Sequence, residues 1–218
     1  MPWICADFTD NKLTTEATEI TEGQNKFKIE SVPETAVSAL EGNLDAAGKR
    51  FALVVARFNS FITERLLVSA CDGLLRTGAQ KKDIDVVRVP GAFEIPSAAR
   101  ALASTGKYDA IICIGCLLRG DTAHYDVIVN EVTRGIGQSA QETGVPHAFG
   151  VLTCDTLEQA IDRAGLKMGN KGFEAALAAV EMASLKTAIS SQPSGLGKSK
   201  SGNRSPRARV SQKNKRQR

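Results

Sequence analysis

The segment AIICIGCLLRGDTAHYD, from Ala110 to Asp126, changes abruptly from apolar to polar. Its first part, AIICIGCLL, is a near-continuous apolar run of the kind expected for a β-strand that is buried on both faces of a parallel sheet. The second part, RGDTAHYD, contains an arginine, a glycine, two acids and one of the two histidines in the chain, His124. The sequence therefore predicts a buried strand that runs directly into a chemically rich loop.

Segments of similar character lie on both sides of this one. Three more apolar runs of strand length occur at 51–56 (FALVVA), 84–89 (IDVVRV) and 147–153 (HAFGVLT). Helical spacing or helix-start signals follow the strands, over 62–74, from about 96, over about 125–143, from about 156 and over 170–189. This alternation favours a four-stranded parallel sheet covered by helices on both faces, which is a three-layer α/β/α sandwich.

Composition favours one globular domain, over residues 41–189, with an extension at each end. The 218 residues are 42% hydrophobic, which is ordinary for a globular protein. Residues 1–40 are polar and show no steady periodicity, so we expect an N-terminal extension that is largely disordered.

The start MPWICADFTD lacks a secretory signal and no apolar run reaches the ~18 residues of a membrane span, so a cytoplasmic protein is expected.

Residues 190–218 form a basic tail with nine lysines and arginines and no acid. The net charge of the whole chain is +4, so the rest of the protein is mildly acidic. Segments rich in Ser, Gly, Lys and Arg bury little apolar surface, and we expect the tail to be disordered. Its charge suits nucleic acid or an acidic partner, and a tail that only keeps the protein soluble is an equal alternative.

Cys113 and Cys116 form a CxxC pair that has two interpretations. The spacing occurs in redox and zinc sites. On an extended strand, however, residues three apart point to opposite faces, so the two sulfur atoms diverge. We therefore expect small core residues and neither a disulfide nor a metal site.

Three loops are expected to meet at one edge of the sheet, because ligands of parallel sheets gather at the carboxyl ends of the strands. RFNSF (57–61), PGAFEIP (90–96) and RGDTAHYD follow the first, second and third strands. His124 suits proton transfer, Glu94 suits hydroxyl groups, and the amides of the glycine-containing loop suit a phosphate. Taken alone, PGAFEIP has the alternative of a rigid turn with Phe93 in the core, and His124 that of a helix cap or a surface residue.

A glycine-rich segment, IDRAGLKMGNKG (161–172), holds three cations spaced by four residues, Arg163, Lys167 and Lys171. On a continuous helix these side chains would form one solvated face. Because the glycines break the segment into a loop between two helices, we expect cations that bind phosphate or carbonyl oxygen atoms.

Five motifs in this order resemble the lumazine synthase family of riboflavin biosynthesis: ARFNSFIT, VPGAFEIP, GCLLRGDTAHYDVIVNE, TGVPHAFGVLT and RAGLKMGNKGFEAALAAVEM. The resemblance covers about Glu41 to Leu185. It implies a flavodoxin-like fold and a transferase that needs no cofactor. The implied reaction is the penultimate step of riboflavin biosynthesis, in which 5-amino-6-(D-ribitylamino)uracil condenses with 3,4-dihydroxy-2-butanone 4-phosphate.

The resemblance also implies roles for individual residues. His124 would move protons as the catalytic residue. The backbone amides of Asp121 and Thr122, together with Arg163, would bind the phosphate. The pyrimidine ring and its ribityl chain would contact Phe58, Ala92, Phe93, Glu94, Cys116, Leu117 and Leu118.

Assembly follows from the same resemblance, because the family forms pentamers or sixty-subunit shells with sites shared between subunits. Phe149 and Lys171 would reach the site from a neighbouring subunit. The short loop 165–170 favours a shell, whereas crowding by the two extensions favours a pentamer. Riboflavin synthase is a further candidate partner. The alternative to an enzyme is a flavin- or lumazine-binding carrier, which would have no need of phosphate-binding cations beside His124.

Overall fold

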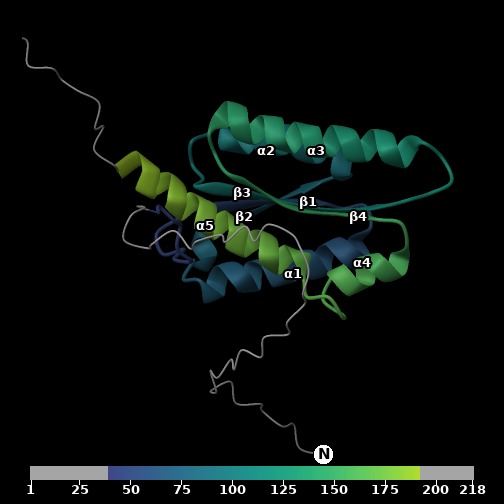
Figure 1. Cartoon of the computed structure of the whole chain (residues 1–218), viewed down its shortest axis with the longest axis horizontal. Coiled ribbons are helices and arrows are strands. Elements are labelled where there is room, and N and C mark those ends of the chain that lie inside the picture. Colours follow the sequence, from purple (N-terminus) through teal and green to yellow (C-terminus); the bar gives the residue numbers. More distant parts are fainter. Residues whose placement is uncertain (1–38, 192–218) are drawn as a thin grey trace, which may run out of the picture. The chain divides into compact units, whose positions relative to one another are not determined.

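The computed structural model describes residues 39–191, which form a four-stranded parallel sheet between two layers of helices. The strand order is β2-β1-β3-β4 (Figure 1). The strands are β1 (Phe51–Ala56), β2 (Ile84–Val89), β3 (Ala110–Leu118) and β4 (His147–Cys154). The predicted α/β fold and all four predicted strands are confirmed. The predicted extensions, 1–40 and 190–218, lie almost entirely outside the described residues.

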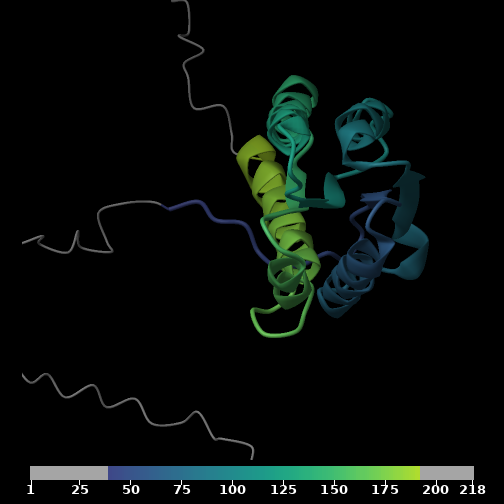
Figure 2. The same ribbon diagram turned by 90° about the vertical axis from the view of Figure 1, so that its right-hand side faces the viewer.

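Helices cover both faces of the sheet, as the alternating sequence pattern predicts. Figure 1 shows one helical layer above the sheet and the other below it, and Figure 2 shows the same layers from the side. One face carries α2 (Ile95–Ala103) and α3 (His124–Thr143). The other face carries α1 (Ser60–Arg76), α4 (Leu157–Arg163) and α5 (Lys171–Ser191).

The two central strands explain why the apolar runs are continuous. Every residue of β1 is buried, and β3 is buried from Ala110 to Cys116. Successive residues belong alternately to the two apolar clusters on opposite faces of the sheet. A strand covered on both sides therefore needs an apolar residue at each position.

The CxxC pair follows this alternation. Cys113 packs on the α2–α3 face and Cys116 on the α1–α5 face, so the predicted divergence of the two sulfur atoms is confirmed. Burial raises the pKa of each thiol to about 12. Both side chains are therefore neutral packing groups rather than nucleophiles.

Some element boundaries differ from the sequence-based expectation. Short 3₁₀ turns at Lys81–Asp83 and Ala92–Glu94 are not predicted by hydrophobic periodicity. The helix-start signal at Thr156 corresponds to half of a capping box: Thr156 accepts a hydrogen bond from the Gln159 amide, but the Gln159 side chain accepts from the Asp155 amide and not from the Thr156 amide. Among residues 39–191, no helix is both long enough and apolar enough to span a bilayer.

Glycine allows α5 to approach α1 at one point near the candidate site. A Cβ atom placed on Gly172 would lie 2.0 Å from the carbonyl oxygen of Leu66. The approach fixes the first turn of α5 against the backbone of α1. The start of α5, and with it Lys171, is thus held by main-chain packing.

We predict that Gly172→Ala destabilises the domain, because the added methyl group would collide with backbone rather than with a mobile side chain. Overpacking of this kind typically costs about 1–3 kcal/mol. The control is Gly137→Ala in α3, where no other part of the described chain lies within 4 Å of the new carbon. At position 137 alanine has less conformational freedom than glycine in the unfolded chain, so the free energy of unfolding should rise by about 0.5–1 kcal/mol. Urea unfolding measures both, and equal stability of the two variants would contradict the close contact.

Candidate active site

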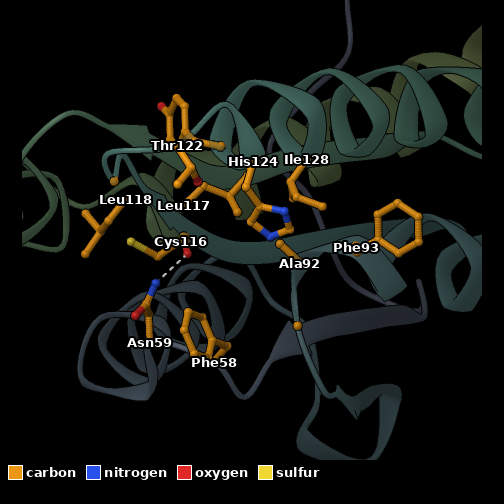
Figure 3. Close-up of a pocket in the computed structure, with 13 residues that line it drawn as sticks. Phe58, Asn59, Ala92, Phe93, Cys116, Leu117, Leu118, Thr122, His124 and Ile128 are labelled. Carbon is orange, nitrogen blue, oxygen red and sulfur yellow. Dashed lines mark hydrogen bonds between the residues drawn. The ribbon is translucent and has the colours of Figure 1, made fainter.

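The three loops that follow β1, β2 and β3 meet at one edge of the sheet and enclose a cavity of about 470 Å³, here called the strand-end cavity. Figure 3 shows Phe58 and Asn59 on one side of it and Thr122, His124 and Ile128 on the other. The sequence-predicted residues that line it are Phe58, Ala92, Phe93, Cys116, Leu117, Leu118, Thr122 and His124. The loops predicted to meet therefore do so.

Backbone hydrogen bonds hold the first two loops together beyond the ends of their strands. The amide of Arg57 donates to Val89 O at 2.8 Å, and the amide of Phe58 donates to Pro90 O at 3.1 Å. These bonds continue the β1–β2 pairing into the loops. The Phe58 ring is therefore carried on a segment with a fixed backbone.

Asn59 connects the first loop to the third strand, and sequence reasoning missed it. Its side-chain nitrogen donates to Cys116 O at 2.8 Å, as the dashed line in Figure 3 marks. It has a φ of 59° and is the only non-glycine residue between 39 and 191 with a positive φ. Asparagine is among the few residues that tolerate this conformation, so an Asn three residues after a predicted strand was the available signal.

Glu94 and Asp121 are the two predicted residues of these loops that do not line the strand-end cavity. The Glu94 carboxylate accepts a hydrogen bond from the Gly91 amide at 2.9 Å and so rigidifies its own loop. Asp121 is exposed and lies between two lining residues, Gly120 and Thr122. Its side chain thus does not place a negative charge in the lining.

Aromatic side chains at the cavity remain accessible. Phe58 is 70% exposed and Phe93 is 56% exposed, although both are large apolar groups. Flat aromatic faces of this kind suit a planar ring or the surface of another protein subunit.

The loop between β3 and α3, which contributes Gly120 and Thr122 to the cavity lining, contains backbone amides that could bind a ligand. Among the described residues, the amides of Gly120, Asp121 and Thr122 donate to no protein acceptor. They precede a helix of 20 residues, whose N-terminal dipole favours negative charge. This combination is suited to an anion such as phosphate.

Arg119 holds this loop in place. Its guanidinium group donates to Asp126 at 3.0 Å and to Asp155 at 2.7 Å, and it stacks over the Tyr125 ring with 4.2 Å between the guanidinium carbon and the ring centre. The Arg119 amide also donates to Cys154 O at 2.9 Å. Arg119 therefore binds the loop to the end of β4.

A second cavity, of about 500 Å³, lies along β4 and is here called the β4 cavity. Phe149, Arg163 and Lys171 line it together with Gln159. Phe149 is 45% exposed, and Lys171 forms an ion pair with Glu174. Among the described residues, Arg163 forms no ion pair, so its charge is available to a ligand.

The structure thus separates the predicted site residues into two groups on one chain. The resemblance placed Arg163 with the phosphate-binding amides and placed only Phe149 and Lys171 on a neighbouring subunit. In the structure all three line the β4 cavity, and none of them lines the strand-end cavity. Lys167, the third cation of the loop, lines neither cavity.

His147, the other histidine, lies at the start of β4 and serves the fold. Its Nδ1–H donates to Val145 O at 2.7 Å, so Nε2 accepts from the Ser139 hydroxyl at 2.9 Å. Burial lowers the pKa of this imidazole.

Among residues 39–191, no group of three or more His, Cys, Asp or Glu side chains is arranged to hold a metal ion.

Comparison with known proteins adds two findings. Residues 48–187 match the model of a family described as 6,7-dimethyl-8-ribityllumazine synthase. A relative named 6,7-dimethyl-8-ribityllumazine synthase, from Desulfotalea psychrophila (strain LSv54 / DSM 12343), is 60% identical over 150 residues. The aligned part covers 69% of this chain and 97% of that relative.

Proposed function

The chain belongs to the 6,7-dimethyl-8-ribityllumazine synthase family, and we propose that it carries out the family reaction at a site formed by its two cavities. The enzyme is a transferase of riboflavin biosynthesis. It condenses 5-amino-6-(D-ribitylamino)uracil with 3,4-dihydroxy-2-butanone 4-phosphate. The observation that carries the proposal is the strand-end cavity, which unites an aromatic surface, free amides and His124 from three separate loops.

The chemistry asks little of the protein beyond alignment and proton transfer. The amine of one substrate forms an imine with the ketone of the other with loss of one water, phosphate is eliminated, and ring closure follows with loss of a second water. Holding two reactants in line can contribute about 7 kcal/mol or more when it replaces a bimolecular encounter. Rigid loops and a proton-transferring side chain are therefore sufficient.

The pyrimidine would bind at the apolar part of the strand-end cavity. The exposed Phe58 face would stack on the ring, while Ala92 and Phe93 on one side and Leu117 and Leu118 on the other would border it. Glu94, whose Oε2 is bonded to Gly91, would act mainly by fixing the loop that borders the ribityl chain.

The phosphate of the second substrate would bind at the start of α3. The free amides of Asp121 and Thr122 would donate hydrogen bonds to its oxygen atoms. His124, in the same helix start, would then lie next to the atoms that exchange protons.

A neighbouring copy of the chain would complete the site. Phe149, Arg163 and Lys171 line a different cavity of the same subunit, so they reach the strand-end cavity only if the two cavities of adjacent subunits face each other. The exposed aromatic rings at both cavities support such a junction. The homo-oligomer would be a pentamer or a sixty-subunit shell, and the short loop 165–170 favours the shell. Riboflavin synthase, and a nucleic acid or acidic partner for the tail, stay predictions.

Incubation of the full-length protein with both substrates tests the function. We expect a fluorescent lumazine product and the release of inorganic phosphate in equal amounts. Tight binding of the pyrimidine without product would instead indicate a carrier and would overturn the proposal.

We predict that His124→Ala lowers kcat by a factor of about 10² to 10⁴, the usual contribution of general acid–base catalysis. KM for both substrates should change little, because stacking and phosphate binding remain. Steady-state kinetics measure both parameters. Unchanged turnover would remove His124 from the proton transfer.

We predict that Arg163→Ala chiefly raises KM for 3,4-dihydroxy-2-butanone 4-phosphate, because a guanidinium forms charge-assisted hydrogen bonds to an oxyanion. The matched control is Lys167→Ala, which removes a cation from the same loop that lines neither cavity. The control should behave as the unmodified chain does. An equal loss of affinity for the two substrates in Arg163→Ala would contradict the assignment.

A further inference from the structure

The two cations of the β4 cavity lie at the ends of two different helices. Arg163 is the last residue of α4 and Lys171 is the first residue of α5. Their relative position therefore depends on the connection 164–170, whose own cation, Lys167, lines neither cavity. For both cations to act on one ligand, contacts within this connection must fix the end of α4 relative to the start of α5.

Asn170 makes the required links with a single side chain. Its Nδ2 donates to Ala164 O, directly after Arg163, at 2.8 Å and to Arg65 O at 3.4 Å. Its Oδ1 accepts from the Gly172 amide at 2.8 Å and from the Phe173 amide at 3.4 Å. One carboxamide thus joins the end of α4, the backbone of α1 and the first turn of α5.

The loop geometry depends on the same contact. Ala164 and Asn170 form an isolated antiparallel bridge, which closes the loop at its neck. Gly165 and Gly169 next to the neck have φ values of 113° and 73°, which disfavour other residues. A Cβ atom on Gly165 would lie only 3.1 Å from Asn170 Nδ2. The two ends of the loop therefore pack closely against the Asn170 side-chain amide.

We propose that Asn170 is a positioning residue that sets the separation of Arg163 and Lys171 so that both reach one phosphate group, an inference that rests on the proposed function. Asn170 itself does not line the β4 cavity. The Asn170 amide supplies the donor for Ala164 O and the acceptor for the start of α5 from two separate atoms, which a single hydroxyl oxygen does not match. An aspartate in its place keeps the helix cap but places an oxygen atom against the Ala164 carbonyl oxygen, which repels it.

The test uses full-length Asn170→Asp and Asn170→Ser in their assembled state, with Asn43→Ala as the matched control. Asn43 resembles Asn170 because its Oδ1 accepts a hydrogen bond from the Asp45 amide, at 3.2 Å, and another from the Ser184 hydroxyl on α5. Asn43 lines neither cavity. For Asn170→Asp we expect KM for the butanone phosphate to rise about tenfold, equivalent to ~1.4 kcal/mol. KM for the pyrimidine and kcat should change far less, and Asn43→Ala should change only the melting temperature.

A double-mutant cycle separates positioning from a purely structural effect. In the Arg163→Ala background, Asn170→Asp should lose most of its effect on KM for the butanone phosphate, because the cation it positions is gone. Full additivity of the two substitutions would overturn the proposal. A lower melting temperature with unchanged KM values would also overturn it, and Asn170→Ser provides the same comparison if the aspartate variant does not assemble.

Inorganic phosphate distinguishes failure of this inference from failure of the proposed function. Calorimetric titration with inorganic phosphate needs no turnover, and Asn170→Asp should weaken its binding to the same extent as it raises KM. An unmodified chain that binds phosphate but forms no lumazine would overturn the function alone. Equal phosphate affinity in the unmodified chain and in Asn170→Asp would overturn the positioning role alone.

Discussion

Parallel pairing of strands that are buried on both faces determines where the loops of the candidate site emerge. The β1 strand pairs with β2 on one side and with β3 on the other, in parallel register. Because all strands run in the same direction, every loop at their carboxyl ends emerges at one edge. Three motifs that are far apart in the sequence are thereby brought to one cavity.

Several polar side chains at this edge hold the loops in place by binding other parts of the protein. Arg119 binds two acids on different segments, Asn59 binds the third strand, and Glu94 binds its own loop. This use of hydrogen bonds leaves a small set of free groups, chiefly the loop amides and His124, in defined positions. A reaction that gains mainly from alignment requires such fixed positions.

The sequence predicts the strands well because two-sided burial leaves a continuous apolar run with sharp limits, as in FALVVA at 51–56. It predicts the cavity loops because each directly follows such a run. It does not predict the links made by Asn59 and Asn170, since each joins a side chain to a backbone carbonyl that is distant in the sequence. Nor does it show that Arg163 and Thr122 line different cavities, which depends on how α4 packs beside β4.

We infer that one active site is built from the strand-end cavity of one subunit and the β4 cavity of the next. Co-assembly of full-length His124→Ala with full-length Arg163→Ala tests it most directly. In the mixed oligomer, some junctions join a cavity with an intact His124 to a neighbour with an intact Arg163. If the site is shared between subunits, these mixed assemblies form lumazine faster than either parent variant alone. Activity equal to the average of the two parents would contradict it, because that result would place the whole site within one subunit.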